Sequence, residues 1–374
     1  MKARRPRPLR ALWLGFGHIG QAAADILVRR DEFPGLADLD VAVVGIVTRT
    51  HGTVLAPRGL DLAAVLSHWR AHGRLPEARR GTPVKDAREA ARILEYDVLV
   101  EMTPLTRKAR GEPAISHLRE ALSRGRHVVS ANKGPLAWAF PALAALARKH
   151  GAEFLHETAV MDGVPVFNLA RHGLRGATVS RVEGILNSTT NAILGALENG
   201  GTFEAALARA QREGFAEADP SDDLEGWDSA VKLSALAQVL MGVALLPERI
   251  ARQGITGLEP GRAVSARARG SRLKLIAEAW RHGGGARGRV ALREVPLSDP
   301  FALVEDTSSI LRIVTDLAGS VVITEERPDI VVTAYGVISD LLAVDAAVSA
   351  SVKARPARRA RGGGSRSLRS RRAR

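Results

Sequence analysis

An aspartate and a lysine four residues apart begin an apolar helical segment in the middle of the chain. Asp228 and Lys232 project from one face of a helix, because residues at i and i+4 are neighbours on its surface. On an exposed face this spacing gives an ordinary salt bridge, and that interpretation stays open. A lysine partly buried among carboxylates stays protonated, however, so Lys232 is a candidate acid that gives a proton to a carbonyl oxygen while hydride reaches the carbon. The segment before the helix supplies the carboxylates Glu217, Asp219, Asp222 and Asp223.

A glycine-rich turn near the N-terminus is the second chemical motif. It lies between an apolar strand pattern at 9–14 and a helical pattern at 21–30, and it reads Gly15, Phe16, Gly17, His18, Ile19, Gly20. This order of strand, turn and helix is the setting in which GxGxxG binds a dinucleotide. We expect Gly15 to permit the turn, Gly17 to let the pyrophosphate approach the helix N-terminus, and Gly20 to allow close packing of helix on strand. An ordinary glycine-rich turn remains the alternative.

Three further segments predict a parallel sheet. Val41–Val47 is apolar and β-branched, as in a strand buried on both faces, and 96–100 and 127–130 follow it. The first of these strands ends in Thr48 and Arg49 instead of an acid, which favours NADP over NAD because a guanidinium suits the 2′-phosphate; a solvated loop arginine is the alternative. Thr103 and Lys133 follow the other two strands, and we expect both to face the nicotinamide end of the cofactor.

The pattern changes after residue 150. Strands are predicted at 154–156, 179–186 and 321–324, helices at 191–198, 203–213 and 229–241, a flexible loop at 283–288 and an apolar helix at 337–348. This mixture indicates a second, α+β domain with its own sheet.

Composition narrows the class of protein. With 374 residues, 45% of them hydrophobic, the chain can bury two cores, and the lack of cysteine excludes disulfides and thiolate sites. The net charge of +14 lies at the ends: residues 353–374 hold Lys353 and nine arginines without an acid, and residues 1–10 hold five more basic residues. With no aromatic residue for base stacking, we read 353–374 as a disordered tail and expect no specific nucleic-acid partner. No apolar run approaches the roughly 18 residues that span a bilayer, so a cytoplasmic protein without a membrane is expected.

Taken in order, these motifs make the chain similar to homoserine dehydrogenases over residues 10–350. The matching segments are 15–20, 101–106, 131–134, 156–165, 187–191, 214–232 and 333–342. The resemblance implies an α/β fold with a basic leader (1–9), a Rossmann domain (10–150), a mixed substrate-binding and dimerisation domain (151–330), a C-terminal helix returning to the Rossmann domain (331–352) and the tail (353–374). It also implies reversible NAD(P)H-dependent reduction of L-aspartate 4-semialdehyde to L-homoserine in threonine, methionine and isoleucine biosynthesis, by a homodimer or tetramer.

The resemblance also implies residue roles. Lys232 corresponds to the proton donor, and Lys133 corresponds to a second active-site lysine. Asp228 and Glu217 correspond to carboxylates that bind the substrate, and Asp222 and Asp223 lie beside them in the sequence. Gly214 and Gly336 match cofactor contacts. A structural sodium site matches Glu157, Val160, Asp162 and Val164.

Two departures keep alternatives open. Asp162 stands where a small residue is usual, and it either adds an oxygen to the cation or points to solvent; Ser188 stands where glycine is usual. A related dehydrogenase for another small aldehyde or hydroxy acid therefore remains an alternative, as does a non-enzymatic NADP-binding protein. For His156 and Glu157 the alternative to a ligand role is a buried capping pair.

Overall fold

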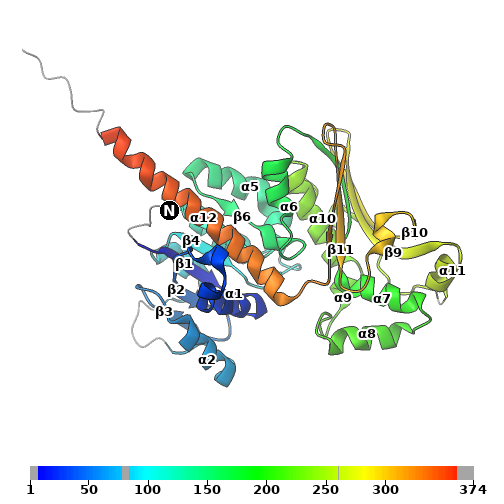
Figure 1. Ribbon diagram of the computed structural model, residues 1–374, viewed down its shortest axis with the longest axis horizontal. Helices are drawn as coiled ribbons and strands as arrows, with labels where there is room; N and C mark the ends of the chain where they lie inside the picture. Colours follow the sequence, from blue (N-terminus) through cyan, green and yellow to red (C-terminus); the bar gives the residue numbers. More distant parts are fainter. Residues whose placement is uncertain (1–6, 78–83, 260, 360–374) are drawn as a thin grey trace, which may run out of the picture.

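The computed structural model describes residues 7–77, 84–259 and 261–359, with side chains as far as residue 350. Two sheets form two halves that lie side by side, and a long C-terminal helix crosses the first half (Figure 1).

The first sheet has the strand order β3-β2-β1-β4-β5-β6, with β3 antiparallel to β2 and all other pairs parallel. Its strands are β1 (Leu9–Leu14), β2 (Val41–Val47), β3 (Thr53–Leu55), β4 (Val98–Glu101), β5 (His127–Ser130) and β6 (Phe154–Leu155). The central strands are apolar because helices cover both faces. These helices are α1 (His18–Val28), α2 (Leu62–His72), α3 (Ala87–Ile93), α4 (Ala114–Ser123) and α5 (Gly134–His150). The strand order reverses between β1 and β4, so a ligand crevice is expected outside their carboxyl ends.

The expectation that 154–156 begins the second sheet is wrong. Phe154 and Leu155 pair in parallel with Val128 and Val129 of β5, so β6 closes the first sheet. A strand this short carries no pattern that identifies its partner; its place follows from α5, which returns the chain to the sheet edge. The leader is also shorter than expected, since β1 begins at Leu9 and Arg7 pairs with Asp97 at 2.6 Å.

The second sheet is almost entirely antiparallel, in the order β12-β11-β7-β9-β10-β8. Its strands are β7 (Val179–Ile185), β8 (Ala251–Arg252), β9 (Ser271–His282), β10 (Gly285–Pro296), β11 (Ser309–Thr315) and β12 (Ser320–Glu325). The helices of this half are α6 (Val166–Asn168), α7 (Ser188–Glu198), α8 (Phe203–Arg212), α9 (Ser221–Leu224), α10 (Trp227–Leu240) and α11 (Arg262–Ala268).

The glycine-rich segment 283–288 is not a flexible loop. Gly283 and Gly284 form the tight turn of the β9–β10 hairpin, where both adopt positive φ (54° and 80°), and the strand resumes at Gly285. Glycine composition alone did not distinguish a two-residue hairpin turn from a long loop.

The last helix, α12 (Ile330–Arg359), is longer than expected at both ends. It includes 353–359, which we expected to be disordered; alanine and arginine are strong helix formers, so the helix continues beyond its buried part. Residues 360–374 lie outside the described residues. The stretch Ile330–Ala350 is long and apolar enough to cross a membrane, contrary to the expectation from sequence, with a mean hydropathy of 1.7. It is a core helix, because one face packs on the first sheet through Ala334, Val337, Ile338, Leu341 and Val344.

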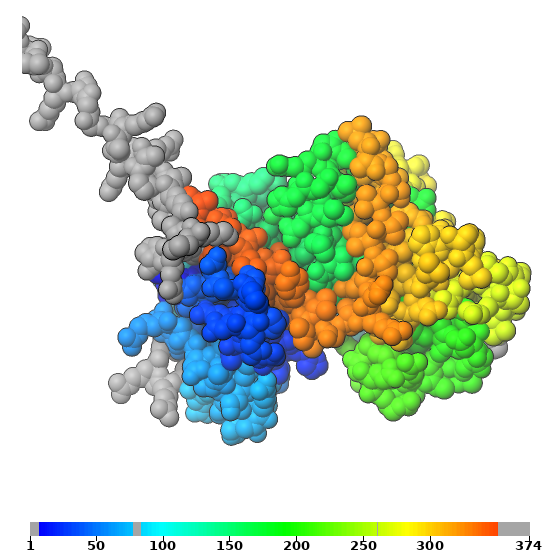
Figure 2. Space-filling view, viewed as in Figure 1, coloured from blue at the N-terminus to red at the C-terminus, as the bar shows by residue number. Residues whose placement is uncertain are grey.

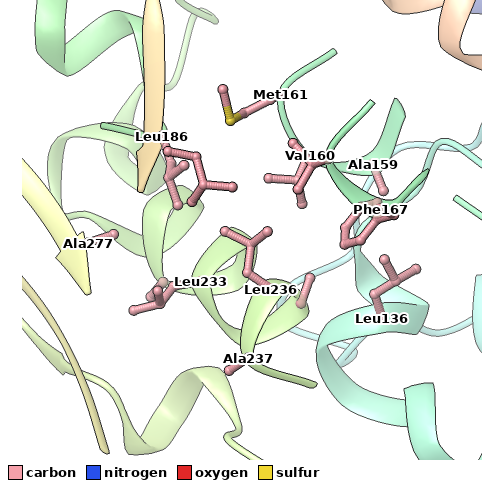
Figure 3. Packing of buried hydrophobic residues seen from close by; sticks show 14 of the residues in the cluster. Leu136, Ala159, Val160, Met161, Phe167, Leu186, Leu233, Leu236, Ala237 and Ala277 are labelled. Atoms are coloured by element: carbon pink, nitrogen blue, oxygen red, sulfur yellow. The ribbon is translucent and has the colours of Figure 1, made fainter. Parts of the chain in front are cut away.

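One hydrophobic cluster joins the two halves around α10. Figure 3 shows Leu233 and Leu236 of α10 among Leu136 of α5, Leu186 after β7 and Val160 of the loop after β6. In the space-filling view the orange segment that ends in α12 covers the surface between the blue first half and the yellow second half (Figure 2). The cluster therefore fixes the start of α10, where Asp228 and Lys232 lie, against the sheet edge of the first domain.

Candidate active site

Two lysines from different domains share one carboxylate. The Lys133 Nζ, just before α5, donates to Asp228 Oδ1 at 2.5 Å, and the Lys232 Nζ lies 3.3 Å from Asp228 Oδ2. All three side chains are largely but not wholly buried, with exposed fractions of 22% for each lysine and 13% for the aspartate. The expected trio is thus brought together at the boundary between the domains.

A set of polar groups around Asp228 fixes its orientation. Asn187 Nδ2 donates to Asp228 Oδ2 at 3.0 Å and to Asp223 Oδ1 at 2.8 Å, and Thr189 Oγ1 donates to Asp223 Oδ2 at 2.9 Å. The Lys232 ammonium also donates to the Leu186 carbonyl at 2.7 Å. Asn187 and Thr189 belong to the matching segment 187–191, but the sequence assigned neither a role. The available signal was amide and hydroxyl residues at the N-terminus of a helix, since Asn187 also caps α7.

Charge compensation controls protonation in this cluster. Burial alone would lower the pKa of Lys232, but the charges of Asp228, Asp162 and Asp223 raise it overall. Burial opposes the charged form of Asp228 as well, but Lys133 and Lys232 hold its pKa well below the usual range. For Asp223, burial and the neighbouring Asp228 raise the pKa. Lys232 is therefore an ammonium at neutral pH beside an ionised Asp228.

The glycine turn after β1 has the geometry of a dinucleotide site. Gly15 has φ +92°, and a Cβ there would lie 2.6 Å from the Met102 carbonyl oxygen, so β4 approaches too closely for a side chain. A Cβ on Gly17 would meet nothing within 4 Å, which leaves the N-terminus of α1 open. A Cβ on Gly20 would lie 3.4 Å from Gly15 O, so this glycine packs closely against the turn. Phe16 is buried and stacks edge-to-face on Trp69, at 5.1 Å between ring centroids, so only its backbone faces the turn. The flanking His18 is exposed and Ile19 half-buried.

The loops after β4 and β5 are bonded to each other. Thr103 N donates to Glu101 Oε1 at 2.9 Å, and Asn132 Nδ2 donates to the Thr103 carbonyl at 3.0 Å. Asn132 Oδ1 in turn accepts from Gly134 N at 2.8 Å, at the beginning of α5. These bonds hold Thr103 and Lys133 at the carboxyl ends of neighbouring strands, on the same sheet edge as the glycine turn.

Arg49 lies beside a cavity at the carboxyl end of β2. Thr48 Oγ1 donates to the Gly52 carbonyl at 2.7 Å, which ties the turn together, and Arg49 is exposed. The adjoining cavity of about 350 Å³ is lined in part by His51 and Arg74. The position is compatible with a phosphate partner.

Two expected substrate residues lie outside the lysine cluster. Asp222 is paired with Arg107 of the first domain at 2.7 Å, and Arg107 also lies over the Trp227 ring at 4.5 Å. Glu217 is exposed. Spacing along an acidic segment could not separate these residues from Asp223, because a short helix and a turn point them in different directions.

The loop expected to hold a cation is tightly packed. The Glu157 carboxylate accepts from Phe167 N at 2.6 Å and Asn168 N at 2.9 Å, so it caps α6, as in the buried-cap alternative. Asp162 does not simply point to solvent: its Oδ1 accepts from Thr333 Oγ1 of α12 at 2.9 Å. Val160 is buried and Val164 half-buried.

The same loop has one feature that fits a cation. Asp162 adopts a left-handed backbone, φ 44°, as does Met161 before it, φ 59°. Beside them, the buried Glu325 Oε1 has no close hydrogen-bond partner among the described residues beyond an interaction of this carboxylate with the Gly163 backbone. Burial, with the charge of Asp162, raises the pKa of Glu325 to about 7. Main-chain and carboxylate oxygens of this kind suit a hard cation.

The remaining expected positions have plainer explanations. Gly336 is a packing glycine in α12, since a Cβ there would lie 2.8 Å from Thr158 Cβ, so the structure gives no support for a cofactor contact. Gly214 is exposed with φ +82° after α8. Ser188 is the first residue of α7 and does not adopt positive φ, so it replaces a glycine without strain.

The geometry supports reduction of a carbonyl by a nucleotide cofactor. A dinucleotide turn, two loops at the same sheet edge and an ammonium held by a carboxylate surround the boundary between the domains. An ammonium placed there can donate a proton to an oxygen that gains charge, and the preorganised charges stabilise that oxygen without rearrangement.

Comparison with known proteins identifies the family. The family model described as homoserine dehydrogenase matches residues 165–342, and that of its NAD binding domain matches residues 15–157. An NAD(+)-dependent homoserine dehydrogenase of Pseudomonas canavaninivorans is 34% identical over 88% of this chain and 94% of its own length. A homoserine dehydrogenase of Methanocaldococcus jannaschii is 33% identical over 88% of this chain and 96% of its own. A hyperthermophilic archaeal homoserine dehydrogenase in complex with NADPH has a TM-score of 0.76 at 25% identity, covering 90% of this chain and 98% of that one. The chain therefore belongs to the homoserine dehydrogenases, NAD(P)-dependent oxidoreductases of amino-acid biosynthesis.

Proposed function

We propose that Lys232 is the proton donor in the reduction of L-aspartate 4-semialdehyde to L-homoserine. The bound dinucleotide supplies the hydride to the aldehyde carbon, and Lys232 Nζ gives its proton to the aldehyde oxygen; oxidation of homoserine reverses both transfers. The observation that supports this role is the position of Lys232, which is largely buried with its Nζ 3.3 Å from Asp228 Oδ2. Burial lowers the pKa of Lys232, but the surrounding carboxylates raise it overall. Lys133 contributes a second positive charge, and Asp228 and Asp223 suit the substrate ammonium.

A kinetic isotope effect tests this role. Lys232→Ala should lower the turnover of L-homoserine by roughly two or more orders of magnitude. The isotope effect is the ratio of the rates with ordinary L-homoserine and with L-homoserine deuterated at the hydroxyl-bearing carbon. Because the chemical step then limits turnover, the isotope effect should increase while NADP still binds. A variant with wild-type turnover and an unchanged isotope effect would remove Lys232 from proton transfer.

We infer a preference for NADP over NAD from Arg49. Its guanidinium is exposed just after β2, which suits a 2′-phosphate, whereas Arg74 of the adjoining cavity is paired with Glu77 at 2.7 Å and adds no surplus charge. Arg49→Ala should raise KM for NADP with little change for NAD, whereas Arg58→Ala, an exposed arginine of the same domain, should change neither. Equal loss with both cofactors would contradict the preference.

We further infer that the loop 157–164 holds sodium as a structural ion, with Glu325 Oε1 as an additional oxygen. Sodium should raise the melting temperature of the wild-type protein more than choline at equal ionic strength. Glu325→Gln should reduce that difference; an undiminished difference would exclude Glu325 from the site.

For the assembly we propose a cytoplasmic homodimer or tetramer joined through the second domain. Leu303 and Leu317 expose 73% and 78% of their surface in this domain, which is consistent with an interface. Light scattering after size exclusion should give at least twice the 39.9 kDa chain mass; a monomeric active enzyme would contradict the proposal.

A further inference from the structure

A second cavity lies toward the C-terminal end of α5, away from Lys133 at its beginning. It has a volume of about 370 Å³, and its walls come from α5, β6, the turn after α6 and the end of α10, which lie next to one another in Figure 1. The residues described above for proton transfer and cofactor binding do not line it. The volume is in the range of small-molecule sites.

Aromatic and small side chains make the cavity apolar. Phe140, Phe154 and Phe167 provide three rings, with Phe140 and Phe154 5.9 Å apart between centroids. Ala144 and Ala147 leave room between α5 and the opposite wall. Such a lining accommodates a flat ring or a branched apolar group.

A buried histidine lines the same cavity. His156 is only 3% exposed, and neither of its ring nitrogens has a hydrogen-bond partner among the described residues, apart from a weak interaction with the Phe154 backbone. Its ring lies edge-to-face with Phe167 at 4.7 Å and Phe140 at 5.5 Å between centroids.

The rim of the cavity carries an excess of positive charge. Arg148 and Arg171 line it together with one acid, Glu153, and the Arg171 Nη1 lies 3.8 Å from Glu153 Oε2. Both members of that pair are about 40% exposed, so it is weak, and Arg148 is exposed. The surplus guanidinium favours an anion, and a carboxylate matches its planar donor geometry.

We propose that this cavity binds a small carboxylate with an aromatic or branched apolar body. The apolar part lies among the three phenylalanine rings and the ring of His156, and the carboxylate meets Arg148 and Arg171 at the rim. This site is independent of the proton-transfer role of Lys232.

The test of the proposal measures binding of 3-phenylpropionate and of benzoate to the full chain. Saturation-transfer NMR detects the binding, and titration gives the dissociation constant. Benzylamine and benzyl alcohol are the charge controls. The carboxylates should bind at millimolar or lower concentration and the controls more weakly. Arg148→Gln and Arg171→Gln should each weaken binding by about fivefold, as loss of one charged contact does, and Arg92→Gln on the exposed face of α3 should not.

Ala144→Trp should abolish binding by filling the cavity, with homoserine turnover as the check that the chain is folded. Because Arg148 is exposed, its variant stays informative if the tryptophan variant does not fold. Any of three results would overturn the proposal. Benzylamine binds as well as the carboxylates, both arginine variants keep wild-type binding, or neither carboxylate binds at about 10 mM, a concentration far above the usual dissociation constant of a specific site.

Discussion

Replacement of Asp228 by asparagine tests how the site keeps Lys232 charged. The substitution keeps the shape and lets Asn187 still donate to the side-chain oxygen, but it removes the negative charge that lies 3.3 Å from Lys232 Nζ and 2.5 Å from Lys133 Nζ. At an effective dielectric constant of about 20, the attraction at 3.3 Å is about 5 kcal/mol. Partial exposure and the remaining Asp223 and Asp162 reduce the net effect to about 1.5–3 kcal/mol, the usual worth of a hydrogen bond to a charged group.

This loss has two consequences for homoserine oxidation. The value of kcat/KM should fall by about 10- to 100-fold, since 1.4 kcal/mol is a factor of ten. In the oxidative direction Lys232 must accept a proton, so the rate rises as the pH approaches its pKa. Without Asp228, burial lowers that pKa against only the weaker opposition of Asp162 and Asp223, and the rise should occur at lower pH than in the wild type.

The assay is a pH–rate profile of L-homoserine oxidation with saturating NADP, beside the control variant Asp222→Asn. Asp222 is as close in sequence, but it pairs with Arg107 outside the lysine cluster, so its variant should keep the wild-type profile. A profile of Asp228→Asn that is lower but not displaced along the pH axis would refute the idea that this carboxylate sets the pKa of Lys232.

Three further predictions concern other parts of the chain. Gly15→Ala should lower the free energy of unfolding by about 1–3 kcal/mol and weaken NADP binding, because the residue has positive φ and its Cβ would collide with Met102. Urea unfolding measures the first effect and NADP titration the second, and an unchanged NADP affinity would contradict the assignment of the turn. Arg107→Ala removes the contacts with Asp222 and Trp227 that join the domains, so kcat/KM for homoserine should fall several-fold with NADP affinity intact; parallel losses of both would argue for simple unfolding. Burial raises the pKa of Asp340 to about 7, so the stability that its neutral carboxyl contributes is present below pH 4 and lost as the pH rises through 7. The free energy of unfolding of Asp340→Asn should therefore increase by about 2 kcal/mol relative to wild type between pH 5 and pH 8, as measured by urea unfolding. A difference that stays constant over this range would show that the group does not titrate there.

Local patterns predicted the parts of the fold that depend on neighbours in sequence. The glycine turn, the apolar strands β1 and β2 and the helix from 227 to 240 follow from composition and periodicity, and the spacing of Asp228 and Lys232 placed them on one helix face. The position of Lys133 after a parallel strand placed it at the sheet edge, and the resemblance to homoserine dehydrogenases added its role as a second active-site lysine. Its contact with Asp228 spans 95 residues and has no local signal.

Long-range pairing accounts for the errors. The two-residue strand β6 contains nothing that specifies its partner, and its assignment to the first sheet depends on α5. The hairpin of β9 and β10 was missed because some of its polar residues are buried in ion pairs with exposed arginines. Glu278, for example, is 3% exposed and pairs with Arg181 and Arg289. Likewise the separation of Asp222 from Asp223 depends on Arg107, which lies more than a hundred residues earlier in the chain.

Initial-rate oxidation of L-homoserine by the purified wild-type chain and by Lys232→Ala, first with NADP and then with NAD, is the most direct test of the central claim. NADP-dependent turnover in the wild type that falls by roughly a hundredfold or more in the variant, with cofactor binding retained, is the predicted result. Comparable turnover in both proteins would show that the proton comes from another group.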